Sequence, residues 1–269
     1  MGLLYQIEKL CVKLRHSATL KGAAPLWAAL RPVYNRLVSL AGRGGLVRHI
    51  NGTDTIRLAP ECRGLGETYE PEVWASVMQH IKPGSRVIDV GAHYGLYAVA
   101  FGLRVGASGR VLAAEPDPEN LRLLHQHIAL NGLQSVVTVV PAAMSDHAGT
   151  ASLSMDSLQS HVSESGALKI ELQTLDAATG NGKWDLLLVD VEGHEEKVLR
   201  GAHALLGDPA RRPGMIVIEV HPYAWADLGT TADSLLSELR EHGYEVRTLD
   251  GQKVSAIERY GHIVATINL

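Results

Sequence analysis

Cysteine is nearly absent from this chain. The 269 residues include two, Cys11 and Cys62, which are far apart and have no cluster of other metal ligands near them. A disulfide framework needs several paired cysteines and a structural zinc site needs closely spaced ligands, so neither is expected. A reducing compartment such as the cytoplasm is the natural location for such a chain.

Long hydrophobic runs are also missing. No stretch approaches the roughly 20 uncharged apolar residues of a membrane-spanning helix, and the first residues lack the compact apolar segment and cleavage site of a secretory signal. The chain has no internal repeat and no low-complexity tract. It has 46% apolar and 20% charged residues, the composition of an ordinary globular protein with a full core. The sequence therefore predicts a soluble, cytoplasmic protein.

The charge is distributed unevenly along the chain. Residues 1–50 carry eight Lys or Arg and one acid, a charge of +7, and the total of −4 leaves −11 for residues 51–269. An acidic body argues against nucleic acid as a partner. The basic arm suits a membrane surface or an acidic partner. Its apolar residues at helical spacing, Leu3, Ile7, Leu10 and Leu14, favour an amphipathic helix packed on the domain or across a homodimer.

Strand and helix patterns alternate along most of the chain. A short hairpin is expected over Leu46–Leu58, after an Arg43-Gly44-Gly45 linker, and a helix over Glu70–Ile81. Further strands are expected at Arg86–Val90, Arg110–Ala114, Val136–Val140, Ala151–Ser154, Lys169–Gln173, Asp185–Val189, Met215–Val220, Tyr244–Thr248 and Tyr260–Ile267. Further helices are expected at Leu96–Val105, Pro118–Leu130, Glu195–Leu206 and Thr231–His242. This alternation predicts an α/β fold with helices on both faces of a mostly parallel sheet, in which one of the last two strands is antiparallel.

Two strand ends carry the features of a nucleoside-binding site. Asp89 precedes two glycines, Gly91 and Gly95, at a strand-to-helix turn, where an acid can accept hydrogen bonds from an ammonium group. Glu115 ends the next strand, twenty residues beyond Gly95, where an acid can accept hydrogen bonds from ribose hydroxyls. Adenosine is therefore implied. The missing third glycine and an acid where a diphosphate would lie disfavour a nicotinamide-dependent oxidoreductase.

Together these stretches resemble the FkbM-type family of class I methyltransferases. The matching segments are Tyr69-Glu70-Pro71, Val87–Gly95, Glu115-Pro116, Ala142–Gly149, Thr174-Leu175-Asp176, Asp185–Glu195 and Ile218–His221. The resemblance implies a Rossmann-like domain over residues 46–269 that binds S-adenosylmethionine, preceded by a helical extension over residues 1–45. It also implies O-methylation of a sugar or polyketide hydroxyl on a small-molecule acceptor.

The resemblance assigns a cofactor role to individual residues. Asp89, Gly91, His93 and Gly95 would form the loop at the methionine side, and Glu115 would hold the ribose. The remaining cofactor-binding residues it implies are Glu70, Pro116, Ala143, Met144 and Ser145, of which the last three would lie near the adenine. Asp190 would lie near the reacting methyl group. The family often has Asn in place of His93 and Lys in place of Leu188, so no catalytic cation is expected at position 188.

The catalytic residues are expected at the ends of two later strands. Methyl transfer to a hydroxyl requires removal of one proton, and His221, His194 and Asp190 are the candidates for this chemistry. His221 is preferred to His194 because it follows a buried strand directly, whereas His194 begins a helix and could face solvent. Asp190, Glu192, Glu219 and His221 could instead bind a divalent cation, but their spacing is no metal signature, so no metal is expected.

Two further segments have simpler interpretations. Asp176 is expected to cap the helix that begins at Ala177. The serine-rich stretch Asp156–Gly166, which contains His161, is interpreted either as an acceptor lid or as a disordered loop. A non-catalytic adenosine-binding or interaction protein on the same sheet is the alternative function, and the intact acids at positions 89, 115 and 190 favour catalysis.

Overall fold

The computed structural model describes residues 44–156, 159–163 and 168–267, together with residue 32. The predicted helical extension over residues 1–45 lies almost entirely outside these ranges, as does Cys11. The chain divides into two compact units, residues 1–69 and 70–269. The expected boundary at residues 45 and 46 stays a prediction. Every helix in the described ranges is too short or too polar to cross a bilayer.

The described part of the first unit is a hairpin and one turn of helix. Strands β1 (Leu46–Ile50) and β2 (Asp54–Leu58) pair in antiparallel register, as predicted. The turn between them uses Asn51 and Gly52, both with positive φ, a conformation that these two residue types tolerate. A 3-10 helix, η1 (Pro60–Gly64), follows the hairpin.

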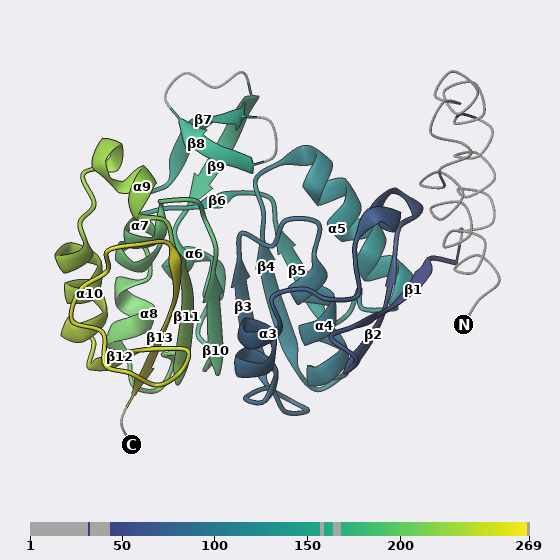
Figure 1. Ribbon diagram of the computed structural model, residues 1–269, viewed down its shortest axis with the longest axis horizontal. Helices are drawn as coiled ribbons and strands as arrows, with labels where there is room; N and C mark the ends of the chain where they lie inside the picture. Colours follow the sequence, from purple (N-terminus) through teal and green to yellow (C-terminus); the bar gives the residue numbers. More distant parts are fainter. Residues whose placement is uncertain (1–31, 33–43, 157–158, 164–167, 268–269) are drawn as a thin grey trace, which may run out of the picture. The chain divides into compact units, whose positions relative to one another are not determined.

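The second unit is built on a seven-stranded sheet (Figure 1). Its strands lie in the order β12-β13-β11-β10-β3-β4-β5, and β13 alone runs in the direction opposite to the other strands of this sheet. In chain order they are β3 (Arg86–Val90), β4 (Arg110–Ala114), β5 (Val137–Val140), β10 (Leu186–Val189), β11 (Met215–Val220), β12 (Tyr244–Thr248) and β13 (Gly261–Ile267). The predicted α/β class, the mostly parallel sheet and the single antiparallel strand are confirmed.

Helices connect and cover these strands. They are α3 (Pro71–Met78), α4 (Leu96–Val105), α5 (Pro118–Leu130), α6 (Leu175–Thr179), α7 (Glu195–Arg200), α8 (His203–Gly207), α9 (Pro222–Trp225) and α10 (Ala232–Glu241), with the 3-10 helix η2 (Ala226–Leu228). The strands β10 and β11 are buried along their whole length. Such strands must be covered on both faces, which explains why their sequences are continuous apolar runs instead of alternating ones.

The predicted helix Glu195–Leu206 is two helices, α7 and α8, and this prediction was therefore wrong. A Cβ at Gly201 would lie 1.9 Å from the carbonyl oxygen of Ser145, so the chain packs too closely there for any larger residue. The carboxylate of Asp176 accepts hydrogen bonds from the amides of Ala204 and Leu205 and so caps the second helix. The break comes from tertiary packing, which the helical spacing of apolar residues does not predict.

A second, smaller sheet has the strand order β6-β9-β7-β8. Its strands are β6 (Ala143–Met144), β7 (Gly149–Asp156), β8 (Gln159–Ser163) and β9 (Leu168–Gln173). In Figure 1 β7, β8 and β9 extend above the main sheet, at the end where β11 leads into α9. The stretch Asp156–Gly166 is thus partly a hairpin strand, and its residues 157–158 and 164–166, like the side chain of His161, lie outside the described part.

The order of the chain reverses between two neighbouring strands. From β3 the chain continues through β4 and β5 to one side, and it returns to β10 on the other side of β3. In open α/β sheets a ligand binds beyond the carboxyl ends of the strands at such a switch point. A ligand site is therefore expected next to the residues that follow β3 and β10.

Candidate active site

The loop after β3 is shaped by two glycines. Gly91 has φ +83°, and a Cβ there would lie 1.7 Å from the carbonyl oxygen of Asp190, which follows β10. Gly95 has φ +88°, and a Cβ there would lie 2.3 Å from a methyl carbon of Leu124 on α5. Both positions require glycine for conformation and for space. At Gly91 the loop therefore passes directly against the end of the neighbouring strand β10.

Asp89 is buried at the end of β3 with an incomplete set of hydrogen bonds. Its Oδ2 is buried and has no hydrogen-bond partner among the described residues. Burial, followed by the charges of Asp190 and Glu115, raises the pKa of Asp89 to about 8. A buried acceptor without a donor fits a ligand that supplies an ammonium group, which is the role predicted for this residue.

Glu115 links three segments at the end of β4. Its Oε1 accepts hydrogen bonds from the backbone amide of Asp117 at 2.9 Å and from Nδ2 of Asn120 at 3.3 Å. Its Oε2 accepts from the backbone amide of His93 at 2.8 Å. Asp117 caps α5 by accepting from the amides of Glu119 and Asn120. Because a carboxylate has about four acceptor positions, Glu115 keeps room for a ribose hydroxyl beside these contacts.

The other residues predicted to bind the cofactor have mixed surroundings. Glu70, in the left-handed conformation before α3, accepts a hydrogen bond from Oη of Tyr97 at 2.9 Å. Ala143 and Met144 form β6 and are buried, as is Ser145. Pro116 is half-buried. The role of these last four residues stays a prediction.

His221, which follows β11, is held by a buried carboxylate. Its Nδ1 lies 2.7 Å from Oε1 of Glu195, and the His221 side chain is 1% exposed. Glu195 also accepts hydrogen bonds from the amide of Gly193 and, at 2.8 Å, from Nε1 of Trp225. Since a carboxylate can only accept, the proton between the two side chains belongs to Nδ1, and neutral His221 keeps its lone pair on Nε2.

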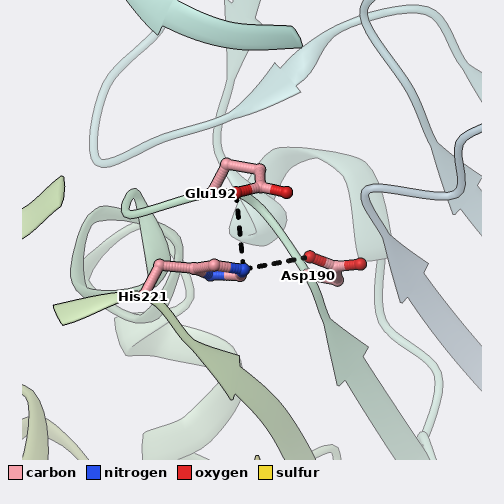
Figure 2. Close-up of side chains that lie close together, drawn as sticks. All are labelled: Asp190, Glu192 and His221. Atoms are coloured by element: carbon pink, nitrogen blue, oxygen red, sulfur yellow. Dashed lines mark ion pairs between the residues drawn. The ribbon is translucent and has the colours of Figure 1, made fainter. Parts of the chain in front are cut away.

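Two further carboxylates face the free nitrogen of His221 (Figure 2). Nε2 lies 3.4 Å from Oε2 of Glu192 and 3.9 Å from Oδ1 of Asp190. One ligand atom from each of these residues falls within 4.8 Å of the others, so the three could hold a divalent cation. Asp190 is 41% exposed, so the group is open to solvent on its side. The structure thus brings together two predicted catalytic residues, His221 and Asp190.

The surroundings of this site shift the pKa values of His221, Glu219 and Asp190. Burial lowers the pKa of His221, but the hydrogen bond to Glu195 and the charges of Glu192, Glu195 and Asp190 outweigh it, so the pKa lies above its ordinary value. Burial and then the charge of Asp190 raise the pKa of Glu219. The pKa of Asp190 is also raised, mainly because the carboxyl is desolvated, although part of its side chain reaches solvent. Glu219 and Asp190 are therefore both harder to ionise than ordinary carboxyl groups.

Two expectations about neighbouring residues need correction. His194 does not face solvent: it is the residue before α7 and is buried. Asp176 does not cap its own helix, because Thr174 does so through a hydrogen bond from the amide of Ala177, while Asp176 caps α8. For Asp176 the reason is a contact with α8, a segment distant in sequence.

Sequence reasoning missed Glu195 as a partner of His221. It also missed Tyr223 and Tyr260, whose rings lie 5.7 and 5.4 Å from the imidazole of His221. Tyr223 donates a hydrogen bond to Glu192 at 2.8 Å, and Tyr260 donates one to Glu219. The one available signal was the run of polar residues after an apolar strand. Such a run predicts a site at the carboxyl end of the sheet, but it does not predict which side chains are in contact.

The strand order, the switch point after β3 and β10, and the acids at the ends of β3 and β4 define a Rossmann-like methyltransferase sheet. Residues 89–246 match the model of the methyltransferase FkbM domain. The chain belongs to this family of S-adenosylmethionine-dependent methyltransferases. The orphaned oxygen of Asp89 and the acceptor positions of Glu115 fit the amino group and the ribose of that cofactor.

Similar proteins include a ribosomal protein L11 methyltransferase from Chloroflexus aurantiacus, 36% identical over 64 residues. That match covers 24% of this chain and 19% of the relative. Among solved structures, an S-adenosylmethionine-dependent O-methyltransferase from Thermotoga maritima is 18% identical with a TM-score of 0.44, covering 74% of this chain and 65% of its own. A ribosomal protein L11 methylase from Lactobacillus delbrueckii subsp. bulgaricus is 18% identical with a TM-score of 0.46, covering 79% and 84%.

Proposed function

We propose that the chain transfers the methyl group to a hydroxyl oxygen of a small-molecule acceptor, a sugar or a natural product of the polyketide type. The observation that carries this proposal is the pair formed by His221 and Glu195 at the carboxyl end of β11. A hydroxyl is a poor nucleophile while it keeps its proton, so its methylation depends on a positioned proton acceptor. An imidazole with its lone pair facing the open side of the site supplies one.

Each residue has a distinct part in this proposal. Asp89 binds the amino group of S-adenosylmethionine and Glu115 its ribose, which places the donor over the switch point. The bound cofactor supplies a methyl group activated by a sulfonium. Nε2 of His221 receives the proton that the acceptor hydroxyl loses as its oxygen forms the new bond to the methyl carbon, while the bond from that carbon to sulfur would break and S-adenosylhomocysteine would be the leaving group. Glu195 keeps the imidazole in the required tautomer and stabilises the imidazolium that results, so it is a positioning residue.

Asp190 and Glu192 complete the surroundings of the reacting oxygen. Their carboxylates lie within 4 Å of Nε2 of His221 and favour a positive charge on it once the proton has arrived. The acceptor hydroxyl can also donate a hydrogen bond to one of them while it approaches, which orients the oxygen. Both effects act at the point where charge develops during the transfer.

The proposal is tested with S-adenosylmethionine labelled with ¹³C in its methyl group. The full chain is incubated with glycosides and natural-product alcohols, and the carbon chemical shift of the product distinguishes an O-methyl ether from an N-methyl or C-methyl group. We expect an ether with the wild-type chain and a strongly reduced yield with His221→Ala. A label that appears on nitrogen or carbon, and never on oxygen, would contradict the proposal.

A further inference from the structure

Two tyrosines beside His221 are exposed to solvent. The side chain of Tyr223 is 65% exposed and that of Tyr260 is 56% exposed, while His221 between the strand end and α9 is buried. In the second unit, the described large hydrophobic residues that are exposed are these two and Leu103. Single exposed apolar residues need no explanation, but two that both contact the imidazole of one site residue form a local feature.

The sheet itself brings the two rings to this place. Helix α9 begins directly after His221, and Tyr223 is its second residue. Tyr260 directly precedes β13, whose Gly261 is paired with Val220 at the end of β11. The antiparallel register therefore delivers Tyr260 to the edge where β11 ends. One ring arrives through local sequence, and the other arrives through the pairing of strands 41 residues apart.

The hydroxyl groups hold both rings in position. Oη of Tyr223 donates to Oε2 of Glu192 at 2.8 Å, and Oη of Tyr260 donates to Oε1 of Glu219. A ring that is already fixed loses little side-chain entropy when a ligand stacks on it, so more of the stacking energy appears as affinity. Each tyrosine thus presents a prearranged aromatic face while its polar end is satisfied by an acid of the site.

Acidic side chains outnumber cationic ones among the described groups that contact these rings and His221. Among the described residues, the ion pairs of Asp190, Glu192, Glu195 and Glu219 are with histidines only, His221 and His262. Recognition of a phosphate or carboxylate needs Arg or Lys, or backbone amides arranged to bind an anion. The described ion pairs of these acids include no Lys or Arg, and Glu192 and Asp190 both lie within 4 Å of the one imidazole of His221, so an anionic group on a ligand at this place is disfavoured.

We propose that Tyr223 and Tyr260 form the acceptor-binding site, and that they take an uncharged saturated ring that carries the reacting hydroxyl. The axial C–H bonds of a pyranose or a cyclohexanol face carry partial positive charge and pack well on the negative face of an aromatic ring. Stacking beside His221 places a ring hydroxyl next to Nε2. This inference rests on the proposed function. It adds that Tyr223 and Tyr260 determine acceptor specificity and that the acceptor carries no negative charge.

The test measures binding of three probes to the full chain by saturation-transfer-difference NMR. The protein is saturated with S-adenosylhomocysteine and kept in EDTA, so that no metal ion contributes to binding. The probes are methyl α-D-glucopyranoside, trans-1,2-cyclohexanediol and methyl α-D-glucopyranosiduronic acid. We expect signal transfer to the ring C–H groups of the two neutral probes and at least tenfold weaker binding of the uronic acid. The two neutral probes distinguish a sugar from a carbocyclic acceptor.

Variants separate stacking from a structural role. Tyr223→Ala and Tyr260→Ala should each weaken binding of the preferred neutral probe at least tenfold, whereas Tyr223→Phe and Tyr260→Phe should keep most of it. Leu103→Ala is the matched control, because it also removes an exposed apolar side chain. Unchanged binding of S-adenosylhomocysteine shows that each variant is folded. Uronic acid that binds as well as the glucoside, neutral probes that do not bind, or alanine variants that bind normally would each overturn the inference.

The two proposals fail in different ways. If the labelled methyl group reaches a nitrogen while ring binding depends on both tyrosines, the proposed O-methylation is wrong and the acceptor site stands. If a hydroxyl is methylated and the alanine variants keep the wild-type KM for the acceptor, the acceptor site is wrong and O-methylation stands. If both proposals hold, KM for the acceptor should rise at least tenfold in the alanine variants. That increase should be larger than the decrease in kcat.

Discussion

Glu195 holds His221 from a different segment of the chain, 26 residues away, and does so with one of its two oxygens. Oε1 lies 2.7 Å from Nδ1 of His221, while Oε2 accepts a hydrogen bond from Nε1 of Trp225. The imidazole cannot rotate without breaking a contact that is fully buried. A fixed ring keeps Nε2 on the side of Asp190 and Glu192, and the first two predictions test that arrangement.

Replacement of His221 by Ala should lower turnover about 10²–10⁴-fold, the usual contribution of a general base. Affinity for S-adenosylhomocysteine, measured by calorimetry, should stay near the wild-type value because Asp89 and Glu115 are untouched. His125→Gln, an exposed position on α5, is the control for loss of an imidazole. Near-full activity of the alanine variant, with activity abolished by EDTA, would instead assign the proton removal to a metal-bound species at Asp190 and Glu192.

Replacement of Glu195 by Gln should shift the pH dependence of kcat/KM. The hydrogen bond and charge of Glu195 raise the pKa of His221 above 6.5, so activity in the wild type is lost as the pH falls through a value above 6.5. The amide removes those contributions, and the acid limb should move to lower pH while maximal turnover falls. An acid limb at the same pH in both proteins would show that His221 does not control it. Thermal unfolding checks that the variant is folded.

Binding of the cofactor product should strengthen as the pH rises from 6 to 8. Asp89 has a pKa of about 8 in the free protein, so it is mostly protonated at neutral pH, whereas an ammonium ligand needs the carboxylate. Affinity for S-adenosylhomocysteine should therefore rise by up to about tenfold per pH unit below that value. Asp89→Asn should bind more weakly and with little dependence on pH. Equal pH slopes for the two proteins would contradict this role.

The elements themselves follow closely from local patterns in the sequence. The short β-branched run Arg86–Val90 and the glycine directly after it, Gly91, are local signals, and they predicted β3 and its loop correctly. The contacts that make the site are not local. Glu195 meets His221, and Tyr260 meets Glu219, because the sheet pairs β11 with β10 and β13. No spacing along the chain reports that pairing.

Replacement of Glu115 by Ala should weaken binding of S-adenosylhomocysteine and also lower the melting temperature. Each lost hydrogen bond to a ribose hydroxyl is worth about 1.5–3 kcal/mol because the acceptor is charged. The same carboxylate holds the backbone amides of His93 and Asp117, so the loop loosens as well. Glu115→Gln keeps an acceptor oxygen and should lose less on both measures. Unchanged affinity in the alanine variant would show that Glu115 does not hold the ribose.

Gly91→Ala should destabilise the protein more than Gly251→Ala. Both glycines have positive φ, +83° and +87°, so both substitutions carry a similar backbone strain of about 1–2 kcal/mol. A Cβ at Gly251 meets nothing within 4 Å, whereas one at Gly91 would collide with the carbonyl of Asp190. Chemical denaturation should therefore show a larger loss for Gly91→Ala, together with lost binding of S-adenosylhomocysteine. Equal losses would mean that the two strand ends can separate freely.

The position of β13 in the sheet sets the order in which this enzyme can become active. β12 pairs with β13, and β13 pairs with β11, so β12 cannot join the sheet before the later strand has arrived. Tyr260 and His262 reach the site with that same strand. The loop after β3 in turn packs against Asp190 at the end of β10, so the cofactor loop also waits for a strand far along the chain. Translation must therefore reach residue 267 before Tyr260 and His262 can take their places beside His221 and Glu219.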